Sequence, residues 1–139
     1  MYISETKIRV RYAETDRMGY VYYGNYAAYF EVGRVEALRA LGLSYKLMEE
    51  QGVMLPVLTY NIKYFKPAFF DDVLTIRTTV NEMPSGTRIH FHYETVNEQN
   101  VVLNKAETSH VFVKTANGRP CAVPENVIDL LRPFLINKV

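Results

Sequence analysis

The sequence predicts an α+β fold in which a curved antiparallel sheet covers one long central helix. One observation is a helical pattern over residues 25–41 that is apolar around much of its circumference. A second is that the later segments are rich in Val, Ile, Thr, Tyr and Phe and are separated by short runs of turn residues. A helix with so much apolar surface needs a cover, and the strands that follow it are the available partner.

Residues 7–12 predict the first strand, because their side chains alternate in character. Ile8, Val10 and Tyr12 fall on one side of an extended chain, and the other side carries Lys7, Arg9 and Arg11. This alternation is typical of a half-buried strand. We therefore expect Tyr12 to end an apolar strand face.

The long helix follows over residues 25–41. At about 100° per residue, one arc of about 120° collects most of its large apolar side chains. The arc consists of Tyr26, Tyr29, Phe30, Gly33, Ala37, Ala40 and Leu41. The few charges are expected on the remaining surface, at Glu31, Arg34, Glu36 and Arg39. Gly42 predicts the end of this helix, and Ser44 predicts the cap of a short second helix that ends before Gly52.

Four strands are then predicted, over residues 54–64, 73–82, 88–96 and 101–114. Turn residues join the last three, which indicates antiparallel hairpins. Pro124 opens a C-terminal helix with apolar residues at Val127, Ile128, Leu130 and Leu131. With 139 residues and no repeat or linker, we expect one domain over residues 1–139.

Composition argues against several functional classes. Sixteen Lys plus Arg against fifteen Asp plus Glu leave a formal charge of +1, which favours neither nucleic acid nor an anionic membrane as a partner. The longest uncharged run, residues 18–30, is too short for a membrane span. Cys121 is the single cysteine, so no internal disulfide is expected and a cytoplasmic location is favoured.

The histidines do not predict a metal site. His90 and His92 fall on one strand face and His110 on another strand, with no cysteine nearby and no third ligand assigned. We expect no metal and no cofactor.

The segment between the first strand and the long helix concentrates possible chemistry. Residues 12–26 hold five tyrosines, two glycines and two carboxylates directly before a helix whose first N–H groups need acceptors. Such donors, with the positive end of the helix dipole, stabilise an oxyanion where a ligand has room to approach. Gly19 and Gly24 permit that approach.

This segment, YAETDRMGYVYYGNY, with Tyr29-Phe30-Glu31 and residues 33–36 after it, resembles the signature of the 4-hydroxybenzoyl-CoA thioesterase family of hot-dog proteins. Residues 64–72 are similar to the second recurring stretch of that family. The resemblance implies an antiparallel sheet around a central helix and hydrolysis of an acyl-CoA without a cofactor. It also implies a homo-oligomer of dimers, paired into a tetramer, with active sites at the subunit interface.

Position by position, the resemblance implies roles for the site residues. Asp16 matches the catalytic carboxylate, which attacks the thioester carbonyl or activates water to do so. Tyr23 falls where a helix-start backbone N–H points at the thioester oxygen, and losing one such donor costs about 2.7 to 4 kcal/mol. Tyr12 matches a position near the carboxylate in the Tol–Pal-associated branch, which carries histidine where this chain has Tyr23. Gly19, Asn25 and Tyr26 are in register and are expected near the substrate.

Each assignment has a structural alternative. Asp16 is also a candidate to cap the turn that follows it, and Tyr12 to pack in the core. Asn25 is also a candidate helix N-cap, and Tyr26 a core anchor.

Three other functions are alternatives to hydrolysis. A non-catalytic acyl-ligand binder or scaffold would use the tyrosines only to line a pocket. A hot-dog dehydratase needs a histidine base, and none precedes His90 in this chain. Binding of RNA through exposed tyrosines is disfavoured by the near-neutral charge.

The acyl group is left open by the sequence. Aromatic candidates for the pocket wall are Tyr20, Tyr22, Tyr23, Phe65, Phe69 and Phe70. Basic candidates for the phosphates of coenzyme A are Lys63, Lys66 and Arg88.

Overall fold

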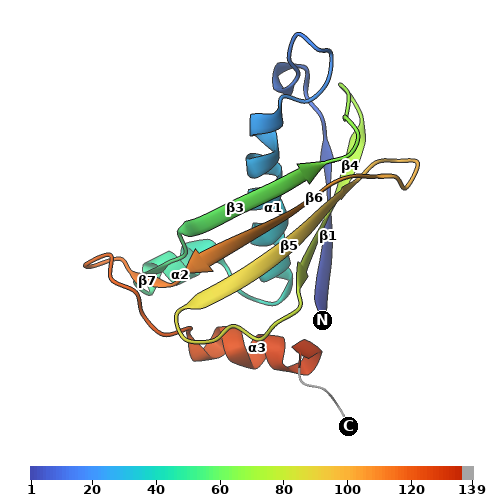
Figure 1. Cartoon of the computed structure of the whole chain (residues 1–139). Helices are drawn as coiled ribbons and strands as arrows, with labels where there is room; N and C mark the ends of the chain where they lie inside the picture. Colours follow the sequence, from blue (N-terminus) through green and yellow to red (C-terminus); the bar gives the residue numbers. More distant parts are fainter. Residues whose placement is uncertain (136–139) are drawn as a thin grey trace.

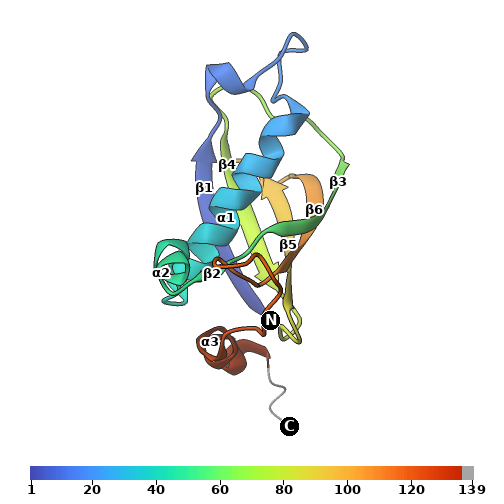
Figure 2. The ribbon, with the colours of Figure 1, turned by 90° about the vertical axis from the view of Figure 1, so that its left-hand side faces the viewer.

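A curved antiparallel sheet wraps one long helix in the computed structural model, which describes residues 1–135. The main sheet has the order β1-β4-β5-β6-β3, and its strands are β1 (Tyr2–Arg9), β3 (Val57–Tyr64), β4 (Val73–Val80), β5 (Arg88–Val96) and β6 (Val102–Val111). The helix α1 (Tyr26–Ala40) crosses one face of this sheet (Figures 1 and 2). The α+β hot-dog architecture predicted from the sequence is confirmed.

Smaller elements lie at the ends of the main sheet and of α1. A two-stranded sheet joins β2 (Val53–Met54) to β7 (Val113–Lys114), next to the short helix α2 (Tyr45–Glu50). The C-terminal helix α3 (Glu125–Leu135) lies at the end of the sheet where the N-terminus is found (Figure 1). Two short 3₁₀ helices, η1 (Tyr12–Glu14) and η2 (Tyr23–Asn25), shape the connection between β1 and α1 at the opposite end.

The packing face of α1 confirms most of the predicted arc. Its buried residues are Tyr26, Tyr29, Phe30, Gly33, Arg34, Ala37 and Leu38. Phe30 stacks on Tyr93 of β5 with ring centroids 4.7 Å apart, which places the aromatic core between helix and sheet. Ala40, predicted in the arc, is exposed, and the buried face turns toward Leu38 in the last turn of the helix.

Arg34 corrects a prediction, because the sequence pattern placed it on the surface and the structure leaves it only 8% exposed. Its guanidinium lies among the hydroxyl groups of Tyr45 and Tyr93. Burial raises the pKa of both phenols, and the Arg34 charge opposes that shift. These hydroxyls are polar neighbours of the buried cation, although Nε of Arg34 and the hydroxyl of Tyr45 have no hydrogen-bond partner among residues 1–135.

The first strand also differs from its prediction. β1 begins at Tyr2 and pairs antiparallel with β4 up to Arg9, opposite Val73. Beyond Val10 the chain turns into η1, so Tyr12 does not end a strand face and is 76% exposed. The alternating pattern over residues 7–12 therefore predicted a strand that extends too far. β4 provides no residue opposite Tyr12, so the strand ends before it.

The later strands follow their predictions with two interruptions. β5 occupies residues 88–96 as predicted, and β4–β5 and β5–β6 pair antiparallel. The predicted segments 54–64 and 101–114 each divide in two, giving β2 with β3 and β6 with β7. Ser44 caps α2 by accepting a hydrogen bond from the N–H of Leu47 at 3.3 Å, as expected.

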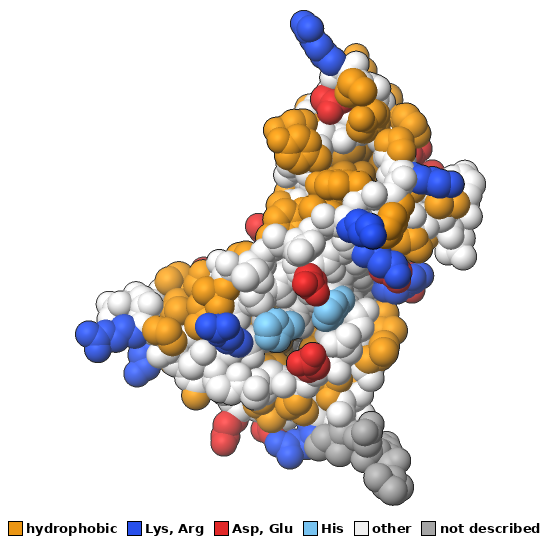
Figure 3. Space-filling model, in the orientation of Figure 1, with side chains coloured by type: hydrophobic (Ala, Val, Ile, Leu, Met, Phe, Trp, Pro, Cys, Tyr) orange, Lys and Arg blue, Asp and Glu red, His pale blue; other side chains and the backbone are white. Residues whose placement is uncertain are grey.

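The face of the sheet turned away from α1 is polar. Cross-strand polar pairs run over it, including the ion pair of Arg77 with Glu94 at 3.1 Å and the contact of His92 with Glu107 at 3.7 Å. Figure 3 shows two histidines and neighbouring acidic side chains in the middle of this face. Within residues 1–135, no helix has both the length and the apolar character needed to cross a membrane.

Candidate active site

The connection between β1 and α1 forms a compact turn that carries Asp16. The N–H of Asp16 donates to the carbonyl of Tyr20 at 3.0 Å, and the N–H of Gly19 donates to the carbonyl of Asp16 at 3.0 Å. Gly19 has a φ of 84°, a left-handed conformation that glycine adopts without steric cost. The Val21 N–H donates to the carbonyl of Ala68 at 2.8 Å, which attaches the turn to the β3–β4 connection.

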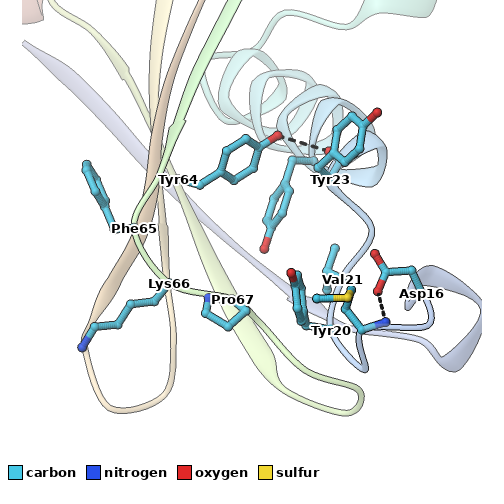
Figure 4. A pocket seen from close by; sticks show the side chains of 10 residues that line it. Asp16, Tyr20, Val21, Tyr23, Tyr64, Phe65, Lys66 and Pro67 are labelled. Atoms are coloured by element: carbon cyan, nitrogen blue, oxygen red, sulfur yellow. Dashed lines mark hydrogen bonds between the residues drawn. The ribbon is translucent and has the colours of Figure 1, made fainter.

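A cavity of about 570 Å³ lies between this turn, the start of α1 and the end of β3 (Figure 4). Its lining is largely aromatic and apolar, with one carboxylate and one ammonium group. The lining residues are Asp16, Met18, Tyr20, Val21, Tyr23, Tyr26, Tyr64, Phe65, Lys66 and Pro67. Because segments far apart in the sequence meet here, the cavity is a product of the tertiary fold.

The carboxylate of Asp16 is only partly engaged by the protein. Its Oδ1 accepts a hydrogen bond from the N–H of Met18 at 2.8 Å, drawn as a dashed line in Figure 4. Its Oδ2 has no protein donor among residues 1–135. Asp16 therefore shapes its own turn, as the capping alternative expected, and still has an oxygen available on the cavity.

Backbone donors at the start of α1 lie beside the same cavity. Tyr23 opens η2, and no acceptor contacts its N–H within the part of the chain that the structure describes. Its side chain is mostly exposed, and the residue is part of the cavity lining. The carbonyl oxygen of Tyr23 lies 3.5 Å from the hydroxyl of Tyr64, at the limit of a hydrogen bond.

Asn25 is not the helix cap that the sequence favoured as an alternative. It precedes α1, but its side chain makes no cap hydrogen bond. Instead its Nδ2 donates to the backbone carbonyl of Glu14 at 2.8 Å. The physical reason is its backbone, which is helical at Asn25, so the side chain turns away from the first N–H groups of the helix.

The other predicted binding residues separate into two groups. Tyr26 is 3% exposed and lines the cavity, so it is both a core residue and part of the wall. Tyr12, Gly19 and Asn25 are outside the lining. The ring of Tyr12 packs edge-on against Phe70 at 5.4 Å between centroids, away from the cavity wall.

Of the aromatic candidates, Tyr20, Tyr23 and Phe65 line the cavity, whereas Tyr22, Phe69 and Phe70 do not. Among the basic candidates, Lys66 belongs to the lining. Lys63 and Arg88 are outside the lining, and Arg88 starts β5 opposite Val111, at the other end of the sheet.

Sequence reasoning missed Tyr64 and the supporting residues Glu14 and Tyr29. Tyr64 ends β3 and reaches the cavity because β3 lies at the sheet edge nearest the start of α1. Its ring lies 5.8 Å from that of Tyr26. A tyrosine directly before Phe65-Lys66-Pro67 is the only signal in the sequence, and it does not reveal what the strand will meet.

The phenols of the wall stay protonated near neutral pH. Burial, followed by the neighbouring Tyr64, raises the pKa of Tyr26 to about 12. Burial also raises the pKa of Tyr64, and Tyr23 adds to that shift. Asp16 supplies the carboxylate of the cavity lining.

The histidines are remote from the cavity and lie on opposite faces of the sheet. His90 and His92 sit on the polar outer face, whereas His110 is fully buried beneath the helix. Within residues 1–135, no group of three metal-ligating side chains is close enough to hold an ion. No histidine lines the cavity described above, so the acid–base pair of a dehydratase is missing there.

Comparison with known proteins agrees with this geometry. Residues 10–131 match the family model of the thioesterase-like superfamily. The chain is 35% identical over 121 residues to the acyl-CoA thioester hydrolase YbgC of Escherichia coli, covering 87% of this chain and 90% of that one. It is also 35% identical over 121 residues to the acyl-CoA thioesterase YbgC of Haemophilus influenzae, covering 86% and 88%.

A solved structure supports the same assignment. The DHNA-CoA thioesterase from Staphylococcus aureus superposes with a TM-score of 0.84 at 36% identity, covering 96% of this chain and 85% of that one. The family model spans most of this chain, and the curated relatives match this chain over nearly their whole length. The chain therefore belongs to the thioesterase-like superfamily of hot-dog proteins.

Proposed function

We propose that this protein hydrolyses an acyl-coenzyme A thioester to a carboxylate and free coenzyme A, with Asp16 as the reacting carboxylate. One observation carries the proposal. In a chain of the thioesterase-like superfamily, one cavity is lined both by Asp16, whose carboxylate is only partly hydrogen-bonded, and by Tyr23, whose N–H has no acceptor among residues 1–135. A nucleophile or base on one side and an oxyanion donor on the other are the two parts that acyl transfer needs.

Two routes use the same atoms. In the first, an oxygen of Asp16 attacks the thioester carbon, the C–S bond breaks, and water hydrolyses the resulting anhydride. In the second, Asp16 takes a proton from a water molecule, which attacks the carbon directly. In both routes, the departing sulfur leaves as thiolate and takes up a proton. Neither route needs a metal or a cofactor.

The N–H of Tyr23 is proposed to polarise the carbonyl. Negative charge develops on the carbonyl oxygen during attack by either route, and a fixed backbone donor stabilises it without rearrangement. The dipole of α1, which begins three residues later, adds to the same field. Because the donor belongs to the main chain, substitution of the Tyr23 side chain by Phe should change turnover little.

The direct test is hydrolysis of a panel of acyl-CoA thioesters, aromatic and aliphatic, by the wild type and Asp16→Asn. We expect turnover by the wild type and a fall in kcat of about 100- to 10,000-fold in the variant. Asp71→Asn is the matched control, since Asp71 is an exposed carboxylate of the β3–β4 connection that pairs with Arg9 at 3.2 Å. It should hydrolyse like the wild type.

The outcomes separate two functions. Retained turnover in a folded Asp16→Asn rejects the role of Asp16. Absence of turnover in the wild type across the panel, with acyl-CoA binding preserved, favours the non-catalytic binder instead.

We further propose that the active form is a homodimer. β3 is an edge strand that pairs only with β6 in the main sheet, so one row of its backbone groups is open for pairing. Val57, Leu58, Tyr60 and Tyr64 along it are exposed apolar side chains. A second copy that meets this edge would also cover the open side of the cavity, as the resemblance implied.

Sedimentation analysis tests the assembly. Two chains per particle support the dimer, and four support the predicted tetramer. Tyr60→Lys, which places a charge on the edge face, should shift the dimer toward monomer. A wild-type monomer that retains full turnover would contradict the proposed assembly.

A further inference from the structure

Glu14 is a carboxylate close to the active site that the proposed chemistry does not use. It lies two residues before Asp16, and its side chain is only 14% exposed. Its Oε1 accepts hydrogen bonds from the hydroxyl of Tyr29 at 2.9 Å and from the N–H of Arg11 at 2.8 Å. It is outside the cavity lining, so it does not face the substrate.

The carboxyl group of Glu14 is ionised and is therefore suited to accept these hydrogen bonds. Burial alone would raise its pKa, but hydrogen bonds from the Arg11 backbone and the Tyr29 hydroxyl, with the Arg11 charge, lower it overall. The side chain is therefore ionised near neutral pH. Tyr29 is buried, and both its burial and the Glu14 carboxylate raise its pKa, so it stays a hydrogen-bond donor.

The main chain of Glu14 makes a second set of contacts with the start of α1. Its carbonyl oxygen accepts hydrogen bonds from the N–H of Tyr22 at 2.9 Å and from Nδ2 of Asn25 at 2.8 Å. Tyr22 directly precedes Tyr23, the proposed oxyanion donor. Glu14 thus contacts the helix start through its carbonyl and the body of the helix through its carboxylate.

We propose that Glu14 and Tyr29 form a clamp that holds Asp16 opposite the N–H of Tyr23, so that Glu14 is a positioning residue for hydrolysis. The inference rests on the proposed function. From Glu14 the chain reaches Asp16 in two residues, and from the carbonyl of Glu14 one hydrogen bond reaches Tyr22. A second connection runs from the N–H of Asp16 to the carbonyl of Tyr20 at 3.0 Å and then along the chain, but it does not reach α1 as the Glu14–Tyr29 contact does.

The size of the expected effect follows from geometry. The turn that carries Asp16 is closed by contacts around Gly19 and attached to the β3–β4 connection through Val21 and Ala68. Of the contacts described for this segment, the one between Glu14 and Tyr29 reaches the body of α1. A displacement of about 1 Å in a reacting group costs up to about 100-fold in rate. Loss of the clamp should therefore lower kcat while the binding of coenzyme A, and with it KM, changes little.

Tyr29→Phe is the first test, because it removes only the hydroxyl that Glu14 accepts from. The ring still packs against Tyr26, at 5.6 Å between centroids. Tyr2→Phe is its matched control, since the buried hydroxyl of Tyr2 donates to the carbonyl of Ala37 at 2.6 Å, in the other half of α1. We expect kcat to fall by up to about 100-fold in Tyr29→Phe only, although both variants lose stability.

Replacements of Glu14 separate charge from shape. Glu14→Gln keeps an oxygen that accepts from Tyr29, so it should retain more of the wild-type kcat than Glu14→Ala. An equal loss of kcat in Glu14→Gln and Glu14→Ala would overturn the clamp. A loss of kcat in Tyr2→Phe as large as that in Tyr29→Phe would overturn it as well, because it would show a general effect of stability.

Hydrogen exchange measures the clamp without reference to activity. In Tyr29→Phe the amides of Asp16, Met18 and Tyr22 should exchange faster, whereas amides in β4 and β5 should not change. Unchanged exchange at these three amides overturns the proposal whatever the activity. Faster exchange with unchanged kcat overturns it as well, since the contact would then be structural only.

Asp16→Asn in the same assay keeps the two hypotheses apart. Turnover lost in Asp16→Asn but kept in Tyr29→Phe overturns the clamp and leaves the proposed function standing. Turnover kept in a folded Asp16→Asn rejects the role of Asp16 and, with it, the positioning role of Glu14.

Discussion

Gly33 of α1 lies directly against Ile76 of β4. A Cβ atom placed on Gly33 would come within 2.7 Å of Cγ2 of Ile76 and equally close to the hydroxyl of Thr78. This is where the helix approaches the sheet closely enough to exclude a methyl group. The contact brings α1 down onto the sheet, and with it the helix start that borders the cavity.

Gly33→Ala should destabilise the fold. Alanine favours a helix over glycine by about 1 kcal/mol, yet the clash with the sheet should outweigh this gain and cost about 1 to 3 kcal/mol. Urea unfolding monitored by circular dichroism measures the difference. Val32→Ala, on the exposed side of the same turn, should stay within about 0.5 kcal/mol of the wild type. A more stable Gly33→Ala would contradict the packing described here.

Gly19→Ala should impair hydrolysis more than its stability cost suggests. The φ of 84° at Gly19 disfavours alanine by about 1 to 2 kcal/mol, although no atom lies within 4 Å of the added methyl. Gly86→Ala is matched, with a φ of 62° and equally open space in the β4–β5 connection. Similar losses in Tm are expected, but kcat should fall only in Gly19→Ala, whose turn carries Asp16. Equal kcat in the two variants would contradict a role of the Gly19 turn in hydrolysis.

His110 should make stability depend on pH in mild acid. Burial, followed by the Arg34 charge, lowers the pKa of His110 from 6.5 to about 4. Between these values the unfolded chain binds a proton that the folded chain does not, so stability falls as pH decreases from about 6.5 toward 4. The full difference corresponds to about 3 kcal/mol.

Denaturant unfolding between pH 5 and pH 8 measures this dependence. His110→Gln should remove most of the slope below pH 6.5, and His92→Gln, on the outer face, should preserve it. Glu14 contributes in the same direction only at lower pH, because its folded pKa is already below the ordinary value of 4.5. An unchanged slope in His110→Gln would refute the assignment.

Lys66 should contribute to substrate binding rather than to the chemical step. It lines the cavity and carries the positive charge that phosphate groups of coenzyme A would meet. Lys66→Ala is expected to raise KM several-fold at low salt with kcat nearly unchanged, since a charge that contacts a remote phosphate stabilises ground and transition states alike. Arg88→Ala, at the far end of the sheet, should leave both constants unchanged.

The elements themselves were largely predictable, and their ends were not. α1, α2, β5 and α3 follow local patterns of period and capping, and each appears where the pattern placed it. The end of β1 was wrong because alternation says nothing about where the partner strand stops. Arg34 was misplaced because its charge indicates a surface position, whereas the hydroxyls that accompany it in the core come from α2 and β5.

Some residues of the candidate site were likewise predictable from the sequence, and others were not. Asp16 and Tyr23 were predicted from one continuous segment, and both residues line the cavity, while their chemical roles stay predictions. Tyr64 was missed because it lies at the end of β3, far along the chain from the segment that holds Asp16 and Tyr23. The Glu14–Tyr29 contact was missed because it joins two turns of chain fifteen positions apart, and neither residue alone predicts it.

What the sequence determined by itself is the set of helices and strands and the hot-dog class, and it also identified the segment that we propose to carry the chemistry. Those properties depend on neighbours along the chain, namely periodicity, turn residues and helix ends, and the sequence displays them directly. Only the tertiary structure decided which strand lies at the edge, which side chains enclose the cavity and which contacts orient Asp16. Those depend on groups that folding brings together from distant positions, whose mutual distances no local pattern specifies.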